Sequence, residues 1–551
     1  MPSIGDDGRE PAFPKLDASE IDRISRCGRR RAVAAGEVLF EPGDRNTHFF
    51  VVVTGVLAVT RPTETGGEEL VRLHGPGEFT GEVDVLLGRR SLVRGQMREP
   101  GELVELDRER VRQLVAIDPV LSDVVMRAFI LRRAFLIQHE KGDVVVVGSQ
   151  HSAETLQLRE FLTRNGHPYS YLDVELHPGV KELLARFGVG VDEIPVVVHR
   201  GRTVLRRPDR RQLAELLGLE LELDDRAVHD VIVVGAGPAG LAAAVYAASE
   251  GLDVLVLEAE APGGQAGSSS KIENYLGFPT GVSGSELAER AFLQAAKFGA
   301  GLSVTQVASR LERSLPYSVF VDGVGVHARA VVIACGARYR KLAIPELGRF
   351  ENAGVYYAAT PVEAQLCRGE EVAIVGGGNS AGQAAVFLSL RVRHVHMLVR
   401  GERLTESMSE YLVRRIEESP RISVRFHTEI VALEGKARLE RVRWRDNHTG
   451  TVETQAIRHV FCMTGADPNT HWLDGSVQLD GKGFIKTGSD LATEELASAA
   501  WPLARPPHFL ESSVPHVFAV GDARAGSVKR VAAAVGEGSA CVQLVHRVLR
   551  E

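Results

Sequence analysis

The chain has 551 residues, a formal net charge of −7 and 44% hydrophobic residues. This length exceeds what one hydrophobic core usually supports, so we expect about three or four domains. The acidic balance argues against a nucleic-acid partner, and because no apolar run reaches about eighteen residues, no membrane span is expected.

The N-terminal segment, MPSIGDDGREPAF, lacks the cationic start and the apolar stretch of a signal peptide, so a cytoplasmic location is expected. The cysteines are few and scattered, which predicts neither a disulfide framework nor a metal site. They are Cys27, Cys335, Cys367, Cys462 and Cys541. No CxxC pair is present.

Residues 1–140 contain short apolar runs separated by glycine and proline turns, and then a helical pattern over residues 108–139. A small β-roll followed by helices accounts for this pattern.

Within this region, the segment GEFTGEVDVLLGRRSL resembles the phosphate-binding cassette of cyclic nucleotide-binding domains. The resemblance implies that Gly81 and Glu82 hold the phosphate and ribose of cAMP or cGMP. The cassette arginine expected about nine residues after the glutamate is replaced by Ser91. Arg89 and Arg90 are the nearby candidates for pairing with the phosphate. A purely structural domain without a ligand is the alternative.

Residues 141–222 alternate strand and helix patterns, which predicts a small α/β domain. The order resembles a thioredoxin or glutaredoxin fold, in which Pro195 would be the cis proline. The positions of the redoxin CxxC, Gly148 to His151, hold no thiol, so this domain cannot exchange disulfides. We interpret it as a docking or spacer domain, with His151 on the surface and an acidic linker at residues 219–225.

The strongest pattern begins at Asp230, where a buried strand leads into GAGPAG and a helix. Gly235 permits the tight turn, Gly237 lets the backbone approach a diphosphate, and Gly240 lets the helix pack closely on the strand. The next predicted strand ends at Glu258, whose carboxylate is placed to bind an adenosine ribose. The segment therefore predicts a dinucleotide-binding Rossmann domain.

A second fingerprint, EVAIVGGGNSAG, has Gly376, Gly378 and Ala381 at the GxGxxA positions. The following strand ends at Arg400 without a carboxylate, which favours NADPH over NADH because Arg400, helped by Arg403, could pair with a 2′-phosphate. A solvated strand end is the alternative for Arg400. Two such domains suit hydride transfer from a nicotinamide to a flavin, and a duplicated scaffold without catalysis is the alternative.

The order of motifs from Asp230 to Glu551 resembles the low-molecular-weight thioredoxin reductases. The matching segments are GGQ at 263–265, KIENYLGFPTGVSGSEL, VVIACGARYRKLAIPE, TGADPNT and VPHVFAVGDARAGSVKR. The resemblance implies an α/β fold with two Rossmann-like domains. The FAD-binding domain would take residues 228–348 and 466–551, and the NAD(P)H-binding domain residues 349–465. A homodimer is also implied.

This resemblance and the two glycine turns assign residues to the cofactors. The residues expected to bind FAD are Gly235, Gly237, Pro238, Ala239, Gly240, Glu258, Gly264, Gln265, Asn274, Val307, Gly336, Asp522, Lys529, Arg530 and Val531. The residues expected to bind NADPH are Gly376, Gly378, Asn379, Ser380, Ala381 and Arg400. Lys529 and Arg530 replace the family's usual Arg-Gln pair, and the added positive charge predicts a raised flavin reduction potential.

The redox-active cysteine pair of that family is absent. Where thioredoxin reductases carry CATC, this chain reads AATP, with Ala358 and Pro361 at the cysteine positions, so no thiol there can relay electrons. We therefore expect a small-molecule or small redox-protein acceptor, in the manner of the ferredoxin and flavodoxin NADP reductases. One alternative is a thioredoxin reductase that uses other cysteines, such as Cys367. Another is a regulatory sensor of flavin state and cyclic nucleotide.

Overall fold

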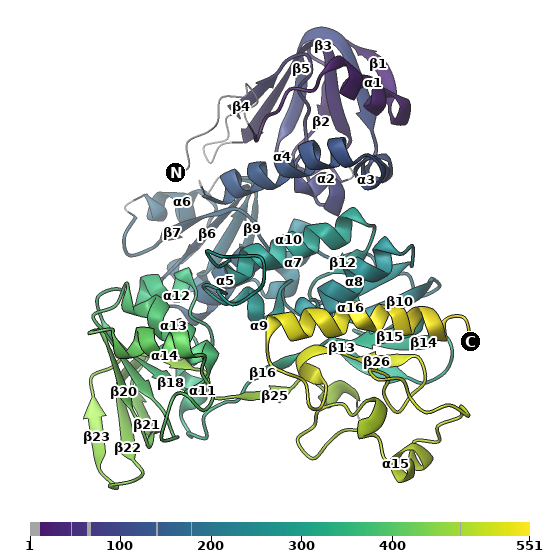
Figure 1. Ribbon diagram of the computed structural model, residues 1–551. Helices are drawn as coiled ribbons and strands as arrows, with labels where there is room; N and C mark the ends of the chain where they lie inside the picture. The colour runs from purple at the N-terminus through teal and green to yellow at the C-terminus, as the bar shows by residue number, and fades with distance from the viewer. Residues whose placement is uncertain (1–10, 46, 63–67, 139–141, 178, 474) are drawn as a thin grey trace. The chain divides into compact units, whose positions relative to one another are not determined.

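The computed structural model describes residues 11–45, 47–62, 68–138, 142–177, 179–473 and 475–551 (Figure 1). Most of the N-terminal segment and the expected domain boundary at residues 140 and 141 lie outside these ranges. The chain divides into two compact units. The first comprises Met1–Gly148, Gly166–Leu221 and Leu293–Ala300, and the second comprises Ser149–Asn165, Glu222–Phe292 and Gly301–Glu551.

The first unit begins with an antiparallel sheet in the strand order β1-β5-β3-β4, with β2 paired to β5. Its strands are β1 (Arg29–Val33), β2 (Val38–Phe40), β3 (Phe49–Pro62), β4 (Glu68–His74) and β5 (Arg94–Leu106). Its helices are α1 (Ala18–Cys27), α2 (Val83–Leu87), α3 (Arg108–Ile117) and α4 (Pro119–Gln138). The rings of Phe49, Phe79 and Phe129, 5.3 to 6.5 Å apart, join sheet and helix in one core. The predicted β-roll is confirmed.

The helices expected over residues 108–139 are α3 and α4, and residue 139 lies outside the described ranges. Helix α3 ends at Ile117, its C-cap Asp118 has an extended backbone at φ = −97° and ψ = 104°, and Pro119 begins α4. A proline disfavours the helical conformation of the residue before it, which explains the break.

The rest of the first unit contains a four-stranded sheet in the order β7-β6-β8-β9. Its strands are β6 (Val144–Gly148), β7 (Tyr169–Asp173), β8 (Val196–His199) and β9 (Thr203–Arg206). Strands β6 and β7 are parallel, and the other neighbours are antiparallel. The helices are α6 (Val180–Arg186), η1 (Val191–Glu193) and α7 (Arg210–Leu217), while α5 (Ala153–Arg164) belongs to the second unit. The Ile194–Pro195 peptide bond is cis, as predicted.

The second unit contains a seven-stranded sheet in the order β12-β11-β10-β15-β14-β13, with β26 paired to β15. Its strands are β10 (Val228–Val234), β11 (Val254–Leu257), β12 (Gly301–Ser303), β13 (Ala308–Glu312), β14 (Tyr317–Val321), β15 (Val324–Ile333) and β26 (Val517–Ala519). Strands β12, β11, β10, β15 and β26 are parallel, and their continuous apolar runs are buried, as is typical of parallel strands.

Two long helices of this domain pack against each other near the first glycine turn. They are α8 (Pro238–Ser249) and α16 (Val531–Val548), drawn in teal and yellow in Figure 1. A Cβ on Gly538 would lie 2.1 Å from the Ala239 carbonyl oxygen, so the two backbones are in close contact there. The C-terminal helix is therefore anchored on the helix that follows the turn.

A second sheet of this unit is parallel throughout, in the order β17-β24-β18-β19-β20. Its strands are β17 (Val355–Tyr356), β18 (Glu371–Val375), β19 (His394–Leu398), β20 (Ile422–Arg425) and β24 (His459–Cys462). The helices between them are α12 (Pro361–Leu366), α13 (Asn379–Ser389) and α14 (Glu410–Glu417). An antiparallel sheet follows, formed by β21 (Thr428–Gly435), β22 (Leu439–Asp446) and β23 (Val452–Gln455).

Two short strands flank the second sheet in the sequence and pair with each other. They are β16 (Ala337–Tyr339) and β25 (Ala466–Pro468). The remaining elements are α9 (Gly264–Gly267), α10 (Gly284–Lys297), α11 (Leu347–Phe350), α15 (Thr493–Ser498), η2 (His471–Leu473), η3 (Gly488–Asp490) and η4 (Gly521–Ala523). Within the described ranges, no helix has the length and apolar character needed to cross a bilayer.

Candidate functional site

The first glycine turn joins β10 to α8 at the carboxyl end of a central parallel strand. Gly235 has φ = 106°, and a Cβ there would lie 2.4 Å from the Ala334 carbonyl oxygen. A Cβ on Gly240 would lie 1.9 Å from the Gly235 carbonyl oxygen, so the helix packs on bare backbone. The nearest atom to a Cβ on Gly237 is the Cα of Gly264, at 4.0 Å. The fold requires glycine at positions 235 and 240, where a side chain would clash with backbone. Gly237, in contrast, leaves open backbone that a diphosphate could approach.

Both Rossmann helices begin in a form suited to a phosphate group. Pro238 and Ala239 open α8, and Asn379 and Ser380 open α13. Each helix has a glycine N-cap, which offers no side chain to bond the N–H groups of the first turn. Unsatisfied N–H groups and the positive end of the helix dipole favour an anion, so the residues present fit the diphosphates of two dinucleotides.

The GGQ segment closes beside the first turn. The Gly263 N–H donates to the Ala236 carbonyl at 2.7 Å. Gly263 and Gly264 have φ values of 99° and 53°, a conformation that favours glycine. The side-chain amide of Gln265 donates to the Ala337 carbonyl, which ties the segment to the start of β16.

Glu258 follows β11 and is 7% exposed. One carboxylate oxygen accepts the Ala236 N–H at 2.6 Å, within the glycine turn. The other accepts the N–H groups of Glu260 and Ala261, at 2.9 and 3.2 Å. Burial raises the pKa of the Glu258 carboxyl, against the opposing effect of these hydrogen bonds. The acid thus shapes the turn itself, and the oxygen that accepts the Ala236 N–H keeps a second lone pair that a ribose hydroxyl could use.

Three further expected FAD contacts lie on loops of the second unit. Asn274 and Val307 are exposed, and Gly336 lies between β15 and β16 with φ = 63°. The Gly336 carbonyl accepts the Asn469 N–H at 3.0 Å, and the Asn469 side chain also bonds the preceding carbonyl. Gly336 is thus fixed at the end of a parallel strand, where ligands bind in open α/β sheets.

Asp522 lies in η4, directly after the apolar strand β26. Its neighbour Gly521 donates its N–H to Glu537 at 2.7 Å, and Arg524 forms a buried ion pair with Glu537 at 2.6 Å. Glu537 therefore holds the loop around Asp522 from within α16. Burial raises the pKa of the Asp522 carboxyl.

The segment before α16 carries the two cationic side chains that the sequence singles out. The Lys529 ammonium donates to the Asp522 carbonyl at 2.7 Å and lies 4.5 Å over the Phe484 ring, and burial lowers its pKa. Arg530 is the exposed N-cap residue of α16, and Val531 begins the helix. In the described ranges, Arg530 forms no ion pair.

The second glycine turn joins β18 to α13. Gly376 has φ = 140°, and a Cβ there would lie 2.4 Å from the Met463 carbonyl oxygen. A Cβ on Gly378 would meet nothing within 4 Å, so this position is as open as its counterpart in the first turn. Ala381 is fully buried at the third position of the fingerprint.

Gly382, the residue after Ala381, makes a close contact between α13 and the segment before α14 that was not predicted from the sequence. A Cβ on Gly382 would lie 2.8 Å from the Met408 sulfur, just before α14. Asn379 also accepts the Ser409 N–H at 2.8 Å through its side-chain oxygen. The glycine beside Ala381 in the sequence is the available signal for this contact.

Arg400 follows β19 by two residues, and Arg403 lies three positions further on. Both side chains are exposed. Among the residues that the structure describes, neither arginine has a carboxylate partner. Both guanidinium groups are therefore free to pair with a phosphate.

The segment where the sequence resemblance expects the family's cysteine pair lies at the start of α12. Ala358 and Ala359 precede the N-cap Thr360, and Pro361 is the first helical residue. Thr360 and Glu363 form a capping box, in which the Thr360 N–H donates to the Glu363 carboxylate at 2.8 Å. The segment is a well-capped helix start without a nucleophile.

The cysteine nearest to this position is not reactive in its surroundings. Cys367 is 0% exposed, and its thiol donates to the Glu363 carbonyl at 3.2 Å. Burial raises the pKa of Cys335, Cys367 and Cys462 to about 12, and it also raises that of Cys541. A thiolate is the nucleophilic form, so these four thiols are inert near neutral pH.

In the N-terminal domain, the key acid of the cassette already has a partner. Arg133 of α4 donates to Glu82 at 3.1 Å and to Asp84 at 3.3 Å. The carbonyl of Gly81 accepts a hydrogen bond from Arg132 at 2.6 Å. Burial raises the pKa of Glu82 well above its ordinary value. A ribose hydroxyl would have to compete with Arg133 for this carboxylate.

The two candidate phosphate arginines have different surroundings. Arg89 is buried, and its positive charge favours the ionised forms of Glu82 and Asp84. Arg90 lies against the last turn of α7, where a Cβ on Gly218 would be 3.4 Å from its Cγ. The sequence alone gives no reason to prefer Arg89 or Arg90, whereas in the structure the two side chains have different neighbours.

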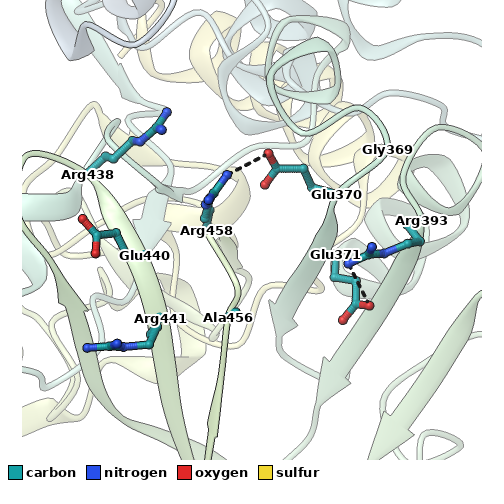
Figure 2. A pocket seen from close by; sticks show the side chains of 9 residues that line it. All are labelled: Gly369, Glu370, Glu371, Arg393, Arg438, Glu440, Arg441, Ala456 and Arg458. Atoms are coloured by element: carbon teal, nitrogen blue, oxygen red, sulfur yellow. Dashed lines mark ion pairs between the residues drawn. The ribbon is translucent and has the colours of Figure 1, made fainter.

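A polar groove of about 560 Å³ lies elsewhere on the second unit, between β18 and the β21-β22-β23 sheet. Figure 2 shows its two internal ion pairs, Arg458 with Glu370 at 3.5 Å and Arg393 with Glu371 at 3.2 Å. Glu371 is the first residue of β18, whereas the glycine turn follows the last, so the groove is at the opposite end of the strand. It is therefore no part of the expected dinucleotide site.

Comparison with known proteins agrees with this geometry. Residues 229–538 match the pyridine nucleotide-disulphide oxidoreductase family, and residues 30–118 match the cyclic nucleotide-binding domain. The chain is 30% identical over 368 residues to NADPH-dependent thioredoxin reductase 3 of Arabidopsis thaliana, a match that spans 64% of this chain and 66% of that protein. It is 33% identical over 312 residues to the thioredoxin reductase of Treponema pallidum, spanning 56% and 94%.

The crystal structure of Lactococcus lactis thioredoxin reductase in its FR conformation superimposes with a TM-score of 0.52 and 25% identity, over 59% of this chain and all of that one. Because the family match extends over more than half of the chain, the protein belongs to the pyridine nucleotide-disulphide oxidoreductases. It is a thioredoxin reductase-like flavin oxidoreductase that carries an N-terminal cyclic nucleotide-binding domain. Membership of the family implies FAD and NAD(P)H as cofactors.

Three residues with clear roles were absent from the sequence-based prediction. They are Arg133, which pairs with Glu82, Glu537, which holds the loop of Asp522, and Gly382, which packs on Met408. Arg133 and Glu537 lie 51 and 16 residues from the groups they bind. A local sequence pattern cannot predict hydrogen-bond partners that lie so far apart in the chain.

Proposed function

We propose that this chain binds FAD at the first glycine turn and NADPH at the second, and passes electrons to an acceptor without a disulfide relay of its own. The acceptor would be a small molecule or a small redox protein. One observation carries the proposal: both cofactor turns keep their open glycine, while the cysteine position holds Ala358 and Pro361.

The residues expected to hold FAD surround the carboxyl ends of β10, β11 and β26. The first-turn N–H groups of α8 would bind the diphosphate, and Glu258 would accept from the adenosine ribose. Asp522 would hydrogen-bond the ribityl or phosphate region of the flavin, and Arg530 stands at the start of α16. When bound, FAD accepts a hydride from a nicotinamide and releases electrons to a second substrate.

The preference for NADPH rests on the end of β19. A carboxylate at this point would repel a 2′-phosphate, and here the strand is followed by the exposed Arg400, which has no carboxylate partner among the residues that the structure describes. Arg403 lies in the same turn and adds a second positive charge. The open Gly378 and the uncapped start of α13 would take the diphosphate.

The thioredoxin-reductase alternative requires a reactive cysteine outside the usual pair. Cys367 is the nearest in sequence, but its complete burial and its pKa of about 12 oppose attack on a disulfide. This argues for an acceptor that takes electrons from the flavin edge.

Further expectations from the resemblance belong to this proposal. The strand order β7-β6-β8-β9, with one parallel and two antiparallel neighbours, supports a thioredoxin-like assignment for residues 141–222. A homodimer and a cyclic nucleotide in the N-terminal domain are carried by resemblance alone, and the Arg133–Glu82 pair weighs against the nucleotide.

The test begins with the visible spectrum of the purified full chain. We expect a yellow protein that bleaches on anaerobic addition of NADPH and bleaches far less readily with NADH. NADPH oxidation should then proceed with a one-electron acceptor such as ferricyanide, and should not proceed with oxidised thioredoxin. A colourless protein that takes up no added flavin would refute the cofactor assignment. Reduction of thioredoxin that is lost in Cys367→Ala would refute the acceptor assignment.

A further inference from the structure

Helix α5 belongs to a different compact unit from the strands on either side of it. Strand β6 ends at Gly148 in the first unit, and that unit resumes at Gly166, whereas Ser149–Asn165 belongs to the second unit. In the sequence, α5 directly follows the thiol-free redoxin position at residues 148–151. The helix that would follow the active site of a redoxin is therefore packed on the flavoprotein part of the chain.

One side of α5 packs against α12, where the family's cysteine pair is expected. Leu156 is 3% exposed and belongs to the same apolar cluster as Ala359 and Cys367. Arg159, which is also buried, donates to the side-chain carbonyl of Gln365 at 3.5 Å. Helix α5 therefore covers one side of the helix that begins at the expected cysteine position.

The last turn of α5 is bonded to the segment that leads into GGQ. Arg164 pairs with Glu260 at 2.9 Å and donates to the Gly264 carbonyl at 3.1 Å. The side-chain amide of Asn165, the C-cap residue, donates to the Glu260 carbonyl at 3.2 Å. Gly264 is one of the residues expected to bind FAD. Helix α5 therefore reaches from the expected flavin site to α12.

The burial of α5 extends over more than one face. Leu156 and Phe161 are five residues apart, which is about 140° around a helix axis, and both are buried. Leu158 and Leu162 are buried as well. A surface helix buries a single apolar stripe against its own domain. The burial of Leu156 thus marks an additional contact, which is the one with α12.

One contact opposes this docking. Burial raises the pKa of the Glu363 carboxyl in α12, and the neighbouring Glu160 of α5 raises it further, against the hydrogen bonds from Thr360. Two carboxylates so placed repel each other when both are ionised. A small number of polar bonds, from Arg159, Arg164 and Asn165, hold the helix in place against this repulsion.

We propose that α5, while it is docked on α12, restricts the electron acceptor to small molecules. This inference rests on the proposed function and narrows its acceptor class. A redox protein needs a free face on the order of 600 Å² on each partner to form even a transient complex. The face beside the expected cysteine position is covered by α5, whereas a small molecule needs no such face. Helix α5 is therefore an element that determines acceptor specificity, and its release would admit a protein acceptor.

The experiment measures anaerobic NADPH oxidation by the full chain, with ferricyanide and cytochrome c as alternative acceptors. We expect rapid reduction of ferricyanide and slow reduction of cytochrome c. The double variant Arg159→Gln/Arg164→Gln loses the charged attachments of α5. Because only the undocked fraction can react with a protein, kcat/KM for cytochrome c should rise by about tenfold or more. Ferricyanide reduction should stay the same.

Hydrogen–deuterium exchange measures the docking itself and needs no turnover. In the double variant, the amides of α12 at residues 361–366 should exchange faster than in the unmodified chain. Leu156→Glu places a carboxylate in the apolar cluster and should raise this exchange further. Thermal unfolding shows whether Leu156→Glu still folds, and the double variant carries the test if it does not.

Arg186→Gln is the matched control, because Arg186 is an exposed arginine in the last turn of α6 and lies outside α5. It should behave like the unmodified protein in both measurements. Equal kcat/KM of the unmodified chain for the two acceptors would overturn the proposal. An unchanged kcat/KM for cytochrome c in a variant whose α12 amides exchange faster would also overturn it.

Unchanged exchange in the double variant would overturn the proposal as well, because α5 would then not be held by the bonds described. A failure of the unmodified chain to reduce ferricyanide would instead refute the proposed function and, with it, the acceptor assignment. The exchange result would still show whether α5 is docked, so the two failures are distinguishable.

Discussion

The two glycine turns of this protein have the same strand–turn–helix form, but different residues surround them. In the first turn, Gly240 packs against the strand backbone, and the next strand leads to the buried Glu258. In the second turn, Ala381 is buried at the equivalent position, and the next strand leads to the exposed Arg400. Both turns leave open backbone that a diphosphate could approach, so under the proposed function the residue after the second strand would distinguish one cofactor from the other.

The largest expected effect separates the glycines that the fold needs from those that a ligand needs. In Gly240→Ala the new methyl group would overlap the Gly235 carbonyl, so the free energy of unfolding of this domain should fall by about 3 kcal/mol. In Gly237→Ala the methyl group meets no atom closer than 4.0 Å, so stability should hold while the flavin content falls. Thermal unfolding of the flavin-free protein and the visible absorbance check both. Equal stability of the two variants would mean that the turn is not packed as described.

The second effect tests the end of β19. Arg400→Gln should raise the KM for NADPH by about tenfold or more and leave the KM for NADH unchanged, because it removes a charged hydrogen bond to the 2′-phosphate. Steady-state kinetics with ferricyanide as acceptor measures both. Arg438→Gln is the control, since Arg438 is an exposed arginine of the same domain that lines the polar groove in Figure 2. An equal loss for both nucleotides would place Arg400 outside the 2′-phosphate site.

The third effect concerns Cys367, the cysteine nearest in sequence to the expected position of the redox pair. Cys367→Ala should leave NADPH oxidation within about twofold and lower the free energy of unfolding by about 1 kcal/mol, because it opens a small cavity. With a pKa of about 12, roughly one Cys367 thiol in ten thousand is ionised at pH 8, and the fraction rises only as the pH approaches the pKa. Iodoacetamide should therefore label the exposed Cys27 first in the folded protein. Rapid labelling of Cys367 would contradict its burial.

The smallest effect compares the two ends of α16. Arg530→Gln should lower the flavin midpoint potential by on the order of 20 mV, because an exposed positive charge at the start of the helix stabilises a negative charge on the reduced flavin only weakly. Arg547→Gln, an exposed arginine in the last turn of the same helix, should not change the potential. Anaerobic redox titration distinguishes them. A midpoint that stays constant in Arg530→Gln would remove this arginine from the flavin environment.

Local spacing was sufficient to predict the β-roll and both strand–turn–helix units. A glycine turn is a short-range feature, because its requirements for positive φ and for close packing fall within about six residues of one segment. The absence of thiols at Ala358 and Pro361 can likewise be read directly. The helices expected over residues 108–139 formed as α3 and α4, with the break between them at Pro119.

Tertiary structure decided which of the expected side chains remain available. Glu82 and Glu258 are both strand- or helix-end acids in the sequence, but folding brings Arg133 to the first and three backbone N–H groups to the second. Arg89 and Arg90 are neighbours in the chain, but the charge of Arg89 acts on the cassette acid Glu82. Arg90 lies beside Gly218 instead. Sequence determines which groups exist and how short segments turn, whereas the partner of a buried charge depends on which distant segments pack beside it.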